Sequence, residues 1–230
     1  MQLDVLGEDP SYLYLAKPSG LPVFPRSEGE GGDCVLTRLL ALRPEQGALN
    51  WPLGFWGGIL HRLDNGTSGL LVVARSLEAL DAGRSLFTDG SLQKTYLFVS
   101  DAEVSWHEHT VDHALAHHPS DRRRMVWQRG QSTKHRGQWR PAVTQFLRLE
   151  GALWQATMSS GARHQIRLHA ASVGLALRGD KLYGGGDGRF CLHHQTLGGW
   201  LGSLPSAPLP GAWPGQSVVV DSSGGGGAAS

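Results

Sequence analysis

The longest uninterrupted apolar run near the centre of this chain spans only residues 70–74 (LLVVA). A membrane-spanning helix needs about 20 apolar residues, so this run cannot cross a bilayer. Because it is short, partly β-branched and preceded by Gly69, it predicts a buried strand. The chain also carries 32 glycines and 12 prolines among 230 residues. Turn-forming residues at that frequency disfavour a helical bundle or a coiled coil.

The length and composition predict one folded domain. Hydrophobic residues make up 40% of the chain, eight are Trp, and the net charge is only +1, which excludes a disordered chain. A chain of 230 residues is at the upper limit for a single core. We expect one domain over residues 1–216 and a flexible Gly/Ser-rich tail over residues 217–230. The two cysteines, Cys34 and Cys191, show no metal-finger spacing and favour a reducing, cytoplasmic location.

Short strands and helices alternate without a regular β-α-β period. Strands are predicted at residues 12–16, 70–74 and 94–100, and a hairpin at residues 143–158 turns at Glu150-Gly151. Helices are predicted at residues 35–42, from the N-cap Ser76 to about Thr88, and at residues 164–173. This order predicts an α+β fold with a mixed, largely antiparallel sheet and flanking helices.

The polar loop HRLDNGTSG at residues 61–69 runs directly into the predicted central strand. Such a junction can present the Asp64 carboxylate rigidly, because the hydroxyls of Thr67 and Ser68 can hold the loop backbone. Asp-Asn-Gly is also a common turn sequence, so the pattern alone is compatible with an ordinary turn.

A second polar segment, SSGARHQIRLHAASVG at residues 159–174, places Arg163 and Arg167 four residues apart. On one face of a helix, two guanidinium groups could bind phosphate or a carboxylate, although they could equally form a solvated face. Tyr96, within the strand KTYLFVS, could be a core residue. His109, His113 and His117 have the spacing of a helix face, but no Cys or firmly placed carboxylate completes a metal site.

Taken in order, these segments resemble the RluA family of pseudouridine synthases. The family pattern consists of an HRLD-x-x-TSG loop, a K-x-Y strand and a G-R-x-HQIR-x-H helix. Four further landmarks match: K-P-x-G-L at residues 17–21, A-x-T at 142–144, G-D-x-x-Y at 179–183 and L-H at 192–193. The resemblance covers about residues 5–213, and it departs from the family at Ala162, where the family has Arg and this chain has Arg163 one position later.

The resemblance implies the pseudouridine synthase fold with a central catalytic cleft. It also implies an RNA-modifying isomerase that flips a uridine out of structured RNA (rRNA or tRNA), cleaves its glycosidic bond and rejoins the base through C5, with no cofactor or metal. Asp64, Tyr96 and Arg167 match the catalytic positions. Arg62, Arg163, His164 and Ile166 match positions that bind the substrate. In the family pattern, the histidine-rich stretch lies in strands and turns. We expect a monomer.

An RNA substrate needs a basic surface, and residues 121–140 provide one candidate. This stretch holds seven Lys or Arg and one Asp, together with Trp127 and Trp139. We expect RNA contacts from Arg122, Arg123, Arg124, Lys134 and Arg136. The alternative is a solvated basic loop.

Two competing functions are compatible with the sequence. One is a catalytically inactive RNA-binding protein of the same fold. The other is a glycoside-acting hydrolase that would use Asp64 and Asp180 as a carboxylate pair.

Overall fold

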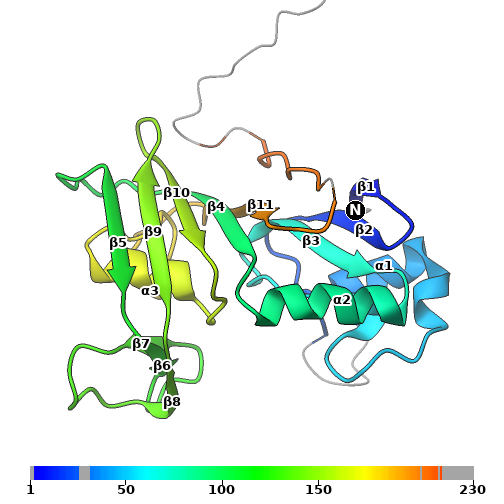
Figure 1. The fold of residues 1–230 in the computed structure, drawn as a ribbon. Helices are drawn as coiled ribbons and strands as arrows, with labels where there is room; N and C mark the ends of the chain where they lie inside the picture. Colours follow the sequence, from blue (N-terminus) through cyan, green and yellow to red (C-terminus); the bar gives the residue numbers. More distant parts are fainter. Residues whose placement is uncertain (1–2, 26–31, 203, 212, 214–230) are drawn as a thin grey trace, which may run out of the picture.

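The computed structural model describes residues 3–25, 32–202, 204–211 and 213, so the tail predicted at residues 217–230 lies outside the described part. Two sheets are present in that part. The larger sheet has eight strands in the order β1-β2-β3-β11-β4-β10-β9-β5, and the smaller has the order β7-β6-β8 (Figure 1). With three α-helices added, the chain has the predicted α+β architecture with a mixed, largely antiparallel sheet.

The elements have the following bounds. The strands are β1 (Asp4–Glu8), β2 (Tyr12–Lys17), β3 (Ser68–Ala74), β4 (Gln93–Val99), β5 (Glu108–Asp112), β6 (Leu115–His117), β7 (Met125–Trp127), β8 (Arg136–Arg140), β9 (Val143–Arg148), β10 (Leu153–Met158) and β11 (Leu192–Gly198). The helices are α1 (Val35–Leu42), α2 (Leu77–Thr88) and α3 (Gln165–Ser172), and two short 3₁₀ turns lie at Pro44–Gly47 and Trp56–Gly58.

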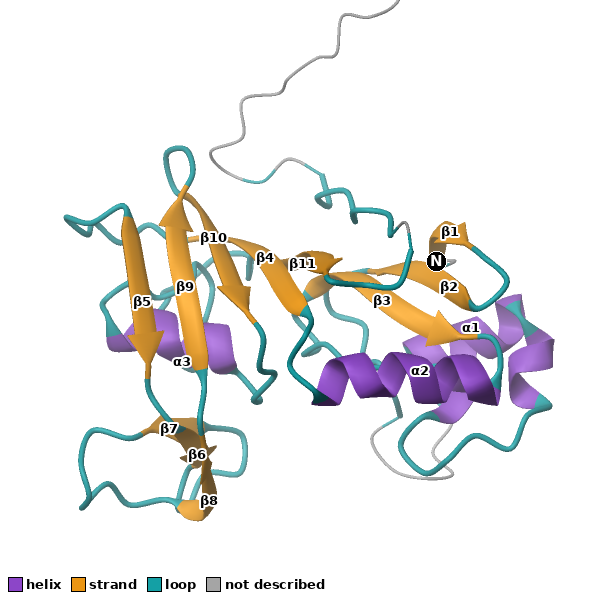
Figure 2. Ribbon diagram, in the orientation of Figure 1, coloured by secondary structure: helices purple, strands orange, loops and turns teal. Residues whose placement is uncertain are grey.

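Strand β3 is buried along its whole length because helices cover both faces of the sheet. Successive side chains of a strand point to opposite faces. On one face, Leu70 and Val72 pack with Leu80 of α2. On the other face, Leu71 and Val73 belong to the core that α1 and α3 complete. Figure 2 shows α2 along the half of the sheet that contains β1–β3, and α3 along the half that contains β5, β9 and β10.

Most predicted elements are confirmed. Helix α1 has the expected bounds, and Ser76 caps α2 by accepting a hydrogen bond from the Ala79 backbone N–H at 3.2 Å. Strands β9 and β10 form the predicted hairpin, in which Gly151 adopts a left-handed conformation with φ of 55°. Glycine tolerates this conformation without the steric penalty of a side chain, so the turn is encoded locally.

The start of α3 differs from the prediction. His164 adopts a left-handed conformation with φ of 58° and stands before the helix, which begins at Gln165. Arg163 therefore precedes the helix, and the prediction that Arg163 and Arg167 share one helix face is wrong. The physical reason is the left-handed backbone at His164, which turns the preceding chain away from the helix axis.

The histidine-rich segment forms strands, as expected from the resemblance. His109 lies in β5 and His117 in β6, and His113 lies in the connection between these strands. The helical interpretation of their spacing is therefore excluded. Among the described helices, none is long and apolar enough to cross a membrane.

Strand β11 pairs in parallel with β3 and places His194 beside Gly69. A Cβ atom at Gly69 would lie 2.1 Å from the His194 carbonyl oxygen, so only glycine allows this approach. His194 is fully buried, and its Nδ1 atom lies 2.8 Å from the Leu70 carbonyl oxygen. Since a carbonyl only accepts, Nδ1 carries the proton. Burial lowers the pKa of His194 to about 4.

The buried His194 makes stability depend on pH. Between about pH 6.5 and 4 the unfolded chain binds a proton that the folded chain excludes, so the free energy of unfolding falls as the pH falls through this range. The expected loss from this residue is up to about 3 kcal/mol. Urea unfolding at several pH values measures it. In His194→Asn, whose amide can still donate to Leu70, the loss should be smaller, and an unchanged pH dependence would contradict the assignment.

Candidate active site

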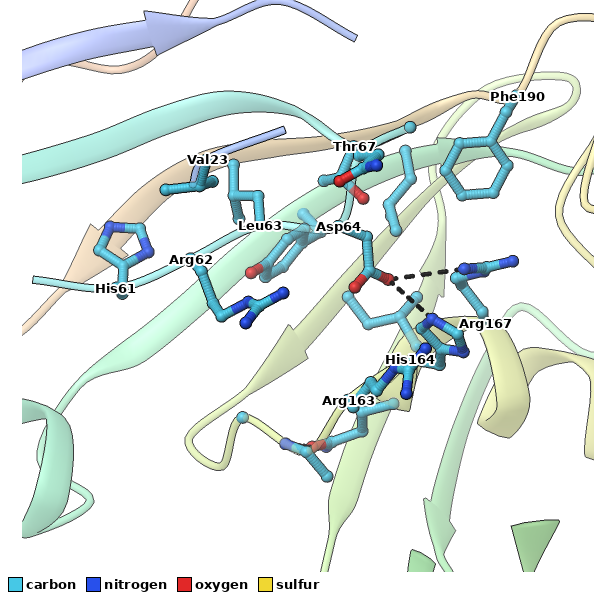
Figure 3. A pocket seen from close by; sticks show the side chains of 18 of the residues that line it. Val23, His61, Arg62, Leu63, Asp64, Thr67, Arg163, His164, Arg167 and Phe190 are labelled. Atoms are coloured by element: carbon cyan, nitrogen blue, oxygen red, sulfur yellow. Dashed lines mark hydrogen bonds and ion pairs between the residues drawn. The ribbon is translucent and has the colours of Figure 1, made fainter. Parts of the chain in front are cut away.

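A cleft of about 1510 Å³ opens between the loop before β3, the start of α3 and the turn at residues 179–182. Residues 60–67 form one wall, and residues 161–167 form the opposite wall. Figure 3 shows Asp64 between these walls, facing Arg167 and His164. The cleft brings together side chains that are about 100 residues apart in the sequence.

Lys17 holds the loop that carries Asp64 through hydrogen bonds to backbone carbonyl oxygens. The Lys17 side chain is buried, and its Nζ atom donates hydrogen bonds to the carbonyl oxygens of Pro18 (2.9 Å) and Asn65 (3.1 Å). The Thr67 backbone N–H donates to the Asp64 carbonyl oxygen at 3.0 Å. Burial lowers the pKa of Lys17 to about 8, and the Asp64 charge partly opposes this shift. These bonds fix the backbone at Asp64 and directly after it.

Arg167 is oriented by a second carboxylate. Its Nε and NH2 atoms each lie 2.7 Å from an oxygen of Asp180, whose side chain has no exposed surface. The remaining nitrogen, NH1, lies 3.5 Å from Oδ2 of Asp64. Burial acts to lower the pKa of Arg167, but the hydrogen bonds to Asp180 and the negative charges of Asp180 and Asp64 together outweigh it, so the pKa is raised. A bidentate pair of this kind fixes the plane of the guanidinium group.

Two aromatic rings hold Arg167 in addition to Asp180. The centre of its guanidinium group lies 5.2 Å from the ring of Tyr183 and 5.1 Å from the ring of Phe190. Cation–π contacts at these distances are favourable. Asp180 and the two rings therefore restrain the Arg167 side chain beside Asp64.

His164 is the second residue that lies beside the Asp64 carboxylate. Its Nε2 atom lies 3.7 Å from Oδ2 of Asp64, and its Nδ1 atom lies 2.9 Å from the Tyr183 hydroxyl. Burial lowers the pKa of His164 to about 4, although the Asp64 carboxylate acts in the opposite direction. The imidazole is therefore neutral at physiological pH.

Tyr96 and Ile166 form the apolar part of the cleft. Tyr96 is only 7% exposed, and its ring stacks on His194 with the centroids 4.6 Å apart. Burial raises the pKa of Tyr96, and the nearby Asp64 charge raises it further, so the hydroxyl stays protonated at neutral pH. Ile166 lines the same cleft and is 3% exposed.

All seven residues predicted as catalytic or substrate-binding line this one cleft. Arg62 is exposed at its edge. The Arg163 guanidinium group donates to the carbonyl oxygens of Arg122 (3.1 Å) and Arg123 (3.3 Å), and so binds the chain that leads into β7. Its contact with a substrate stays a prediction. Of the five predicted RNA-binding residues, Arg123 also lines the cleft.

Three residues of the site were not predicted as site residues from the sequence: Lys17, Asp180 as the partner of Arg167, and Tyr183. Asp180 and Tyr183 do lie in the G-D-x-x-Y segment, which was noted as a landmark, and Lys17 lies in the K-P-x-G-L segment. Their partners are distant in the sequence, so no local pattern could have revealed the contacts.

Solved structures show which fold this chain has. Human RNA Pseudouridylate Synthase Domain Containing 1 superposes with a TM-score of 0.69 at 21% identity, covering 85% of this chain and 78% of that one. Human RNA Pseudouridylate Synthase Domain Containing 4 gives a TM-score of 0.63, also at 21% identity, covering 84% and 82%. The chain has the pseudouridine synthase fold.

Sequence comparison adds the family. A family model described as RNA pseudouridylate synthase matches residues 11–172. Ribosomal large subunit pseudouridine synthase D of Nitrosomonas europaea is 34% identical over 188 residues, which cover 79% of this chain and 50% of that protein. Its counterpart in Xylella fastidiosa is 36% identical over 190 residues, covering 80% and 52%. The chain belongs to the RNA pseudouridylate synthase family, and it spans about half the length of these curated relatives.

Because the Asp180–Arg167 pair is buried, we expect that removing one of its charges lowers the stability of the protein strongly. In Asp180→Asn, Arg167 keeps its buried charge but loses the fully buried carboxylate that accepts both of its short hydrogen bonds, so the free energy of unfolding should fall by about 3 kcal/mol. Asp187→Asn is the matched control, because Asp187 is 97% exposed and pairs only with the exposed Lys181. Denaturant unfolding of both variants tests the difference, and equal stabilities would contradict the role of the pair.

Proposed function

We propose that this protein converts a uridine in RNA to pseudouridine. In this isomerisation the bond between C1′ of the ribose and N1 of uracil breaks, C1′ bonds to C5, and the hydrogen on C5 leaves while N1 gains one. The observation that carries the proposal is the position of Asp64. Lys17 holds the backbone next to it through the Asn65 carbonyl oxygen, Arg167 and His164 lie beside its carboxylate, and the residue lines a cleft of about 1510 Å³.

The cleft suits a single nucleotide that has left its helical stack. An enzyme cannot reach a base within a duplex, so the nucleotide must be extruded at a cost of a few kcal/mol. Tyr96 offers a ring on which uracil can stack, and its protonated hydroxyl is suited to proton exchange at C5. Arg62, exposed at the edge of the cleft, is positioned to contact the extruded nucleotide, and Ile166 supplies an apolar wall.

The carboxylate pair needed by a glycoside hydrolase is not supported. Asp180 has no exposed surface, and both of its carboxylate oxygens accept hydrogen bonds from Arg167. It is therefore unable to act as a second acid or base on a substrate. The assembly of Asp64, Tyr96 and Arg167 around one cleft likewise supports turnover over mere RNA binding.

We infer that the substrate is a uridine of large-subunit ribosomal RNA. Two relatives with over 30% identity are named ribosomal large subunit pseudouridine synthase D, and this is the support for rRNA over tRNA. The monomeric state and the cytoplasmic location expected from the sequence stay predictions.

The smaller sheet is the proposed RNA surface. Arg122, Lys134 and Arg136 are exposed on it or beside it. Trp127 in β7 stacks with His113 at 4.8 Å between ring centroids, and the guanidinium group of Arg129 lies 5.0 Å from the Trp127 ring. Exposed cations next to aromatic rings are suited to RNA backbone and base contacts. Arg163 connects this surface to the cleft through its bonds to the backbone of the chain leading into β7.

The reaction is tested by release of tritium from ribosomal RNA labelled at C5 of uridine. Wild-type protein should release tritium and leave the RNA strand mass unchanged, whereas Asp64→Asn should lose at least about 10³-fold in rate because the acting carboxylate is gone. Asp187→Asn, exposed and outside the cleft lining, is the control. Absence of release from every cellular RNA defeats the proposal, release of free uracil indicates hydrolysis, and release from tRNA alone refutes the rRNA substrate.

The RNA surface is tested by the salt dependence of binding. Lys134→Gln with Arg136→Gln should reduce the slope of log K against log salt by about one unit for each phosphate that the variant no longer neutralises. The control double variant, Arg75→Gln with Arg84→Gln, removes the same charge just before α2 and within α2, in the other half of the molecule (Figure 1). Equal slopes for the two double variants would exclude the smaller sheet from the interface.

A further inference from the structure

We propose that Tyr183 is a positioning residue for catalysis: it holds His164 in the tautomer that directs an N–H at Oδ2 of Asp64, so that Oδ1 is left to act on the nucleotide. The inference rests on the proposed function for its consequence in turnover. The tautomer of His164, however, can be measured without any substrate.

The hydrogen-bond partners of the Tyr183 hydroxyl determine where its proton points. The Met125 backbone N–H donates to this oxygen at 2.9 Å, and His164 Nδ1 lies 2.9 Å from it. A phenol carries one proton and can accept as well as donate. With the Met125 N–H as the incoming donor, the hydroxyl proton is available for Nδ1 of His164. Tyr183 is buried, and burial raises its pKa, so it keeps that proton at neutral pH.

An imidazole that accepts at Nδ1 carries its proton on Nε2. His164 is neutral, because burial lowers its pKa to about 4. The charged groups around it are Asp64 and Asp180, which favour protonation, and Arg167 and Arg163, which oppose it. The Nε2 atom lies 3.7 Å from Oδ2 of Asp64. A neutral His164 therefore directs an N–H at the carboxylate without neutralising its charge.

His164 and Arg167 both approach the same oxygen of the Asp64 carboxylate. His164 Nε2 and Arg167 NH1 lie 3.7 and 3.5 Å from Oδ2 of Asp64. In Figure 3 both dashed lines end on this oxygen, and the other oxygen lies on the side of Arg62. Two nitrogens on the side of Oδ2 favour one orientation of the carboxylate, in which Oδ1 faces the side of Arg62.

The backbone supports a dedicated role for this histidine. His164 is the sole non-glycine residue in the described ranges with a positive φ, and its side chain makes no capping bond to α3. Such a conformation is unfavourable for a residue with a side chain and persists where the surrounding structure imposes it. Here it allows the ring to reach Asp64 and Tyr183 at the same time.

Nitrogen NMR of protein labelled with ¹⁵N-histidine tests the tautomer. The His164 signals are assigned by their loss in His164→Gln. In wild type at pH 7, Nε2 should carry the proton and Nδ1 should be unprotonated, and Tyr183→Phe should shift His164 toward a mixture of the two tautomers. A proton on Nδ1 in wild type, or identical spectra in Tyr183→Phe, would overturn the proposal, whatever the protein does to RNA.

Two replacements of His164 separate the roles of the two nitrogens in turnover. The side-chain amide of Gln can occupy the position of Nε2, and that of Asn the position of Nδ1. We expect His164→Asn to lower kcat about 10-fold more than His164→Gln, with KM for RNA unchanged in both. Tyr183→Phe should lower kcat about 10-fold in the wild-type background and cause no further loss in the His164→Gln background.

The outcomes distinguish this inference from the proposed function. Equal losses in His164→Asn and His164→Gln, or a full additional loss from Tyr183→Phe in the His164→Gln background, would show that Tyr183 does not act through His164. If wild type forms no pseudouridine, the proposed function fails, and the NMR tautomer still decides the positioning.

Discussion

The site depends on one buried ion pair, between Arg167 and Asp180. Both hydrogen bonds of the pair are 2.7 Å long, and Asp180 has no exposed surface. Asp180 also accepts from the Leu182 backbone N–H at 3.1 Å, which fixes the carboxylate within its own turn. Removing charges from water is unfavourable, and such a pair persists where the geometry satisfies both partners. In this protein the pair fixes the direction of Arg167, and Arg167 in turn restrains Asp64.

The two walls of the cleft are anchored to the sheet by different means. The Asp64 loop leads into β3, which is packed on both faces, and Lys17 from β2 holds the loop through backbone carbonyls. On the opposite wall, the Gln165 side chain donates to Thr144 at the start of β9 at 3.1 Å, and His169 lies 2.8 Å from the same hydroxyl. Each wall is thereby tied to a rigid strand, so the distance between Asp64 and Arg167 is set by the sheet.

The smaller sheet is joined to the catalytic wall at two points. Arg163 binds the backbone of the chain entering β7, and the Tyr183 hydroxyl accepts from Met125 within β7. The surface proposed to bind RNA is therefore connected to His164, the residue beside Asp64, through Arg163 and Tyr183. The proposed RNA surface and the placement of His164 depend on the same short segment of the chain.

The sequence by itself determined the α+β class, the bounds of α1 and α2, the hairpin of β9 and β10, and the family, because caps, turns and apolar periodicity act between near neighbours. The motif at residues 61–69 also singled out Asp64, which lines the cleft. Only the tertiary structure decided that Arg163 stands outside α3 and that Arg167 pairs first with Asp180. It also showed that His164 bridges Asp64 and Tyr183. These contacts join residues brought together by the packing of the cleft walls and by the left-handed turn at His164, and no local pattern in the chain encodes them.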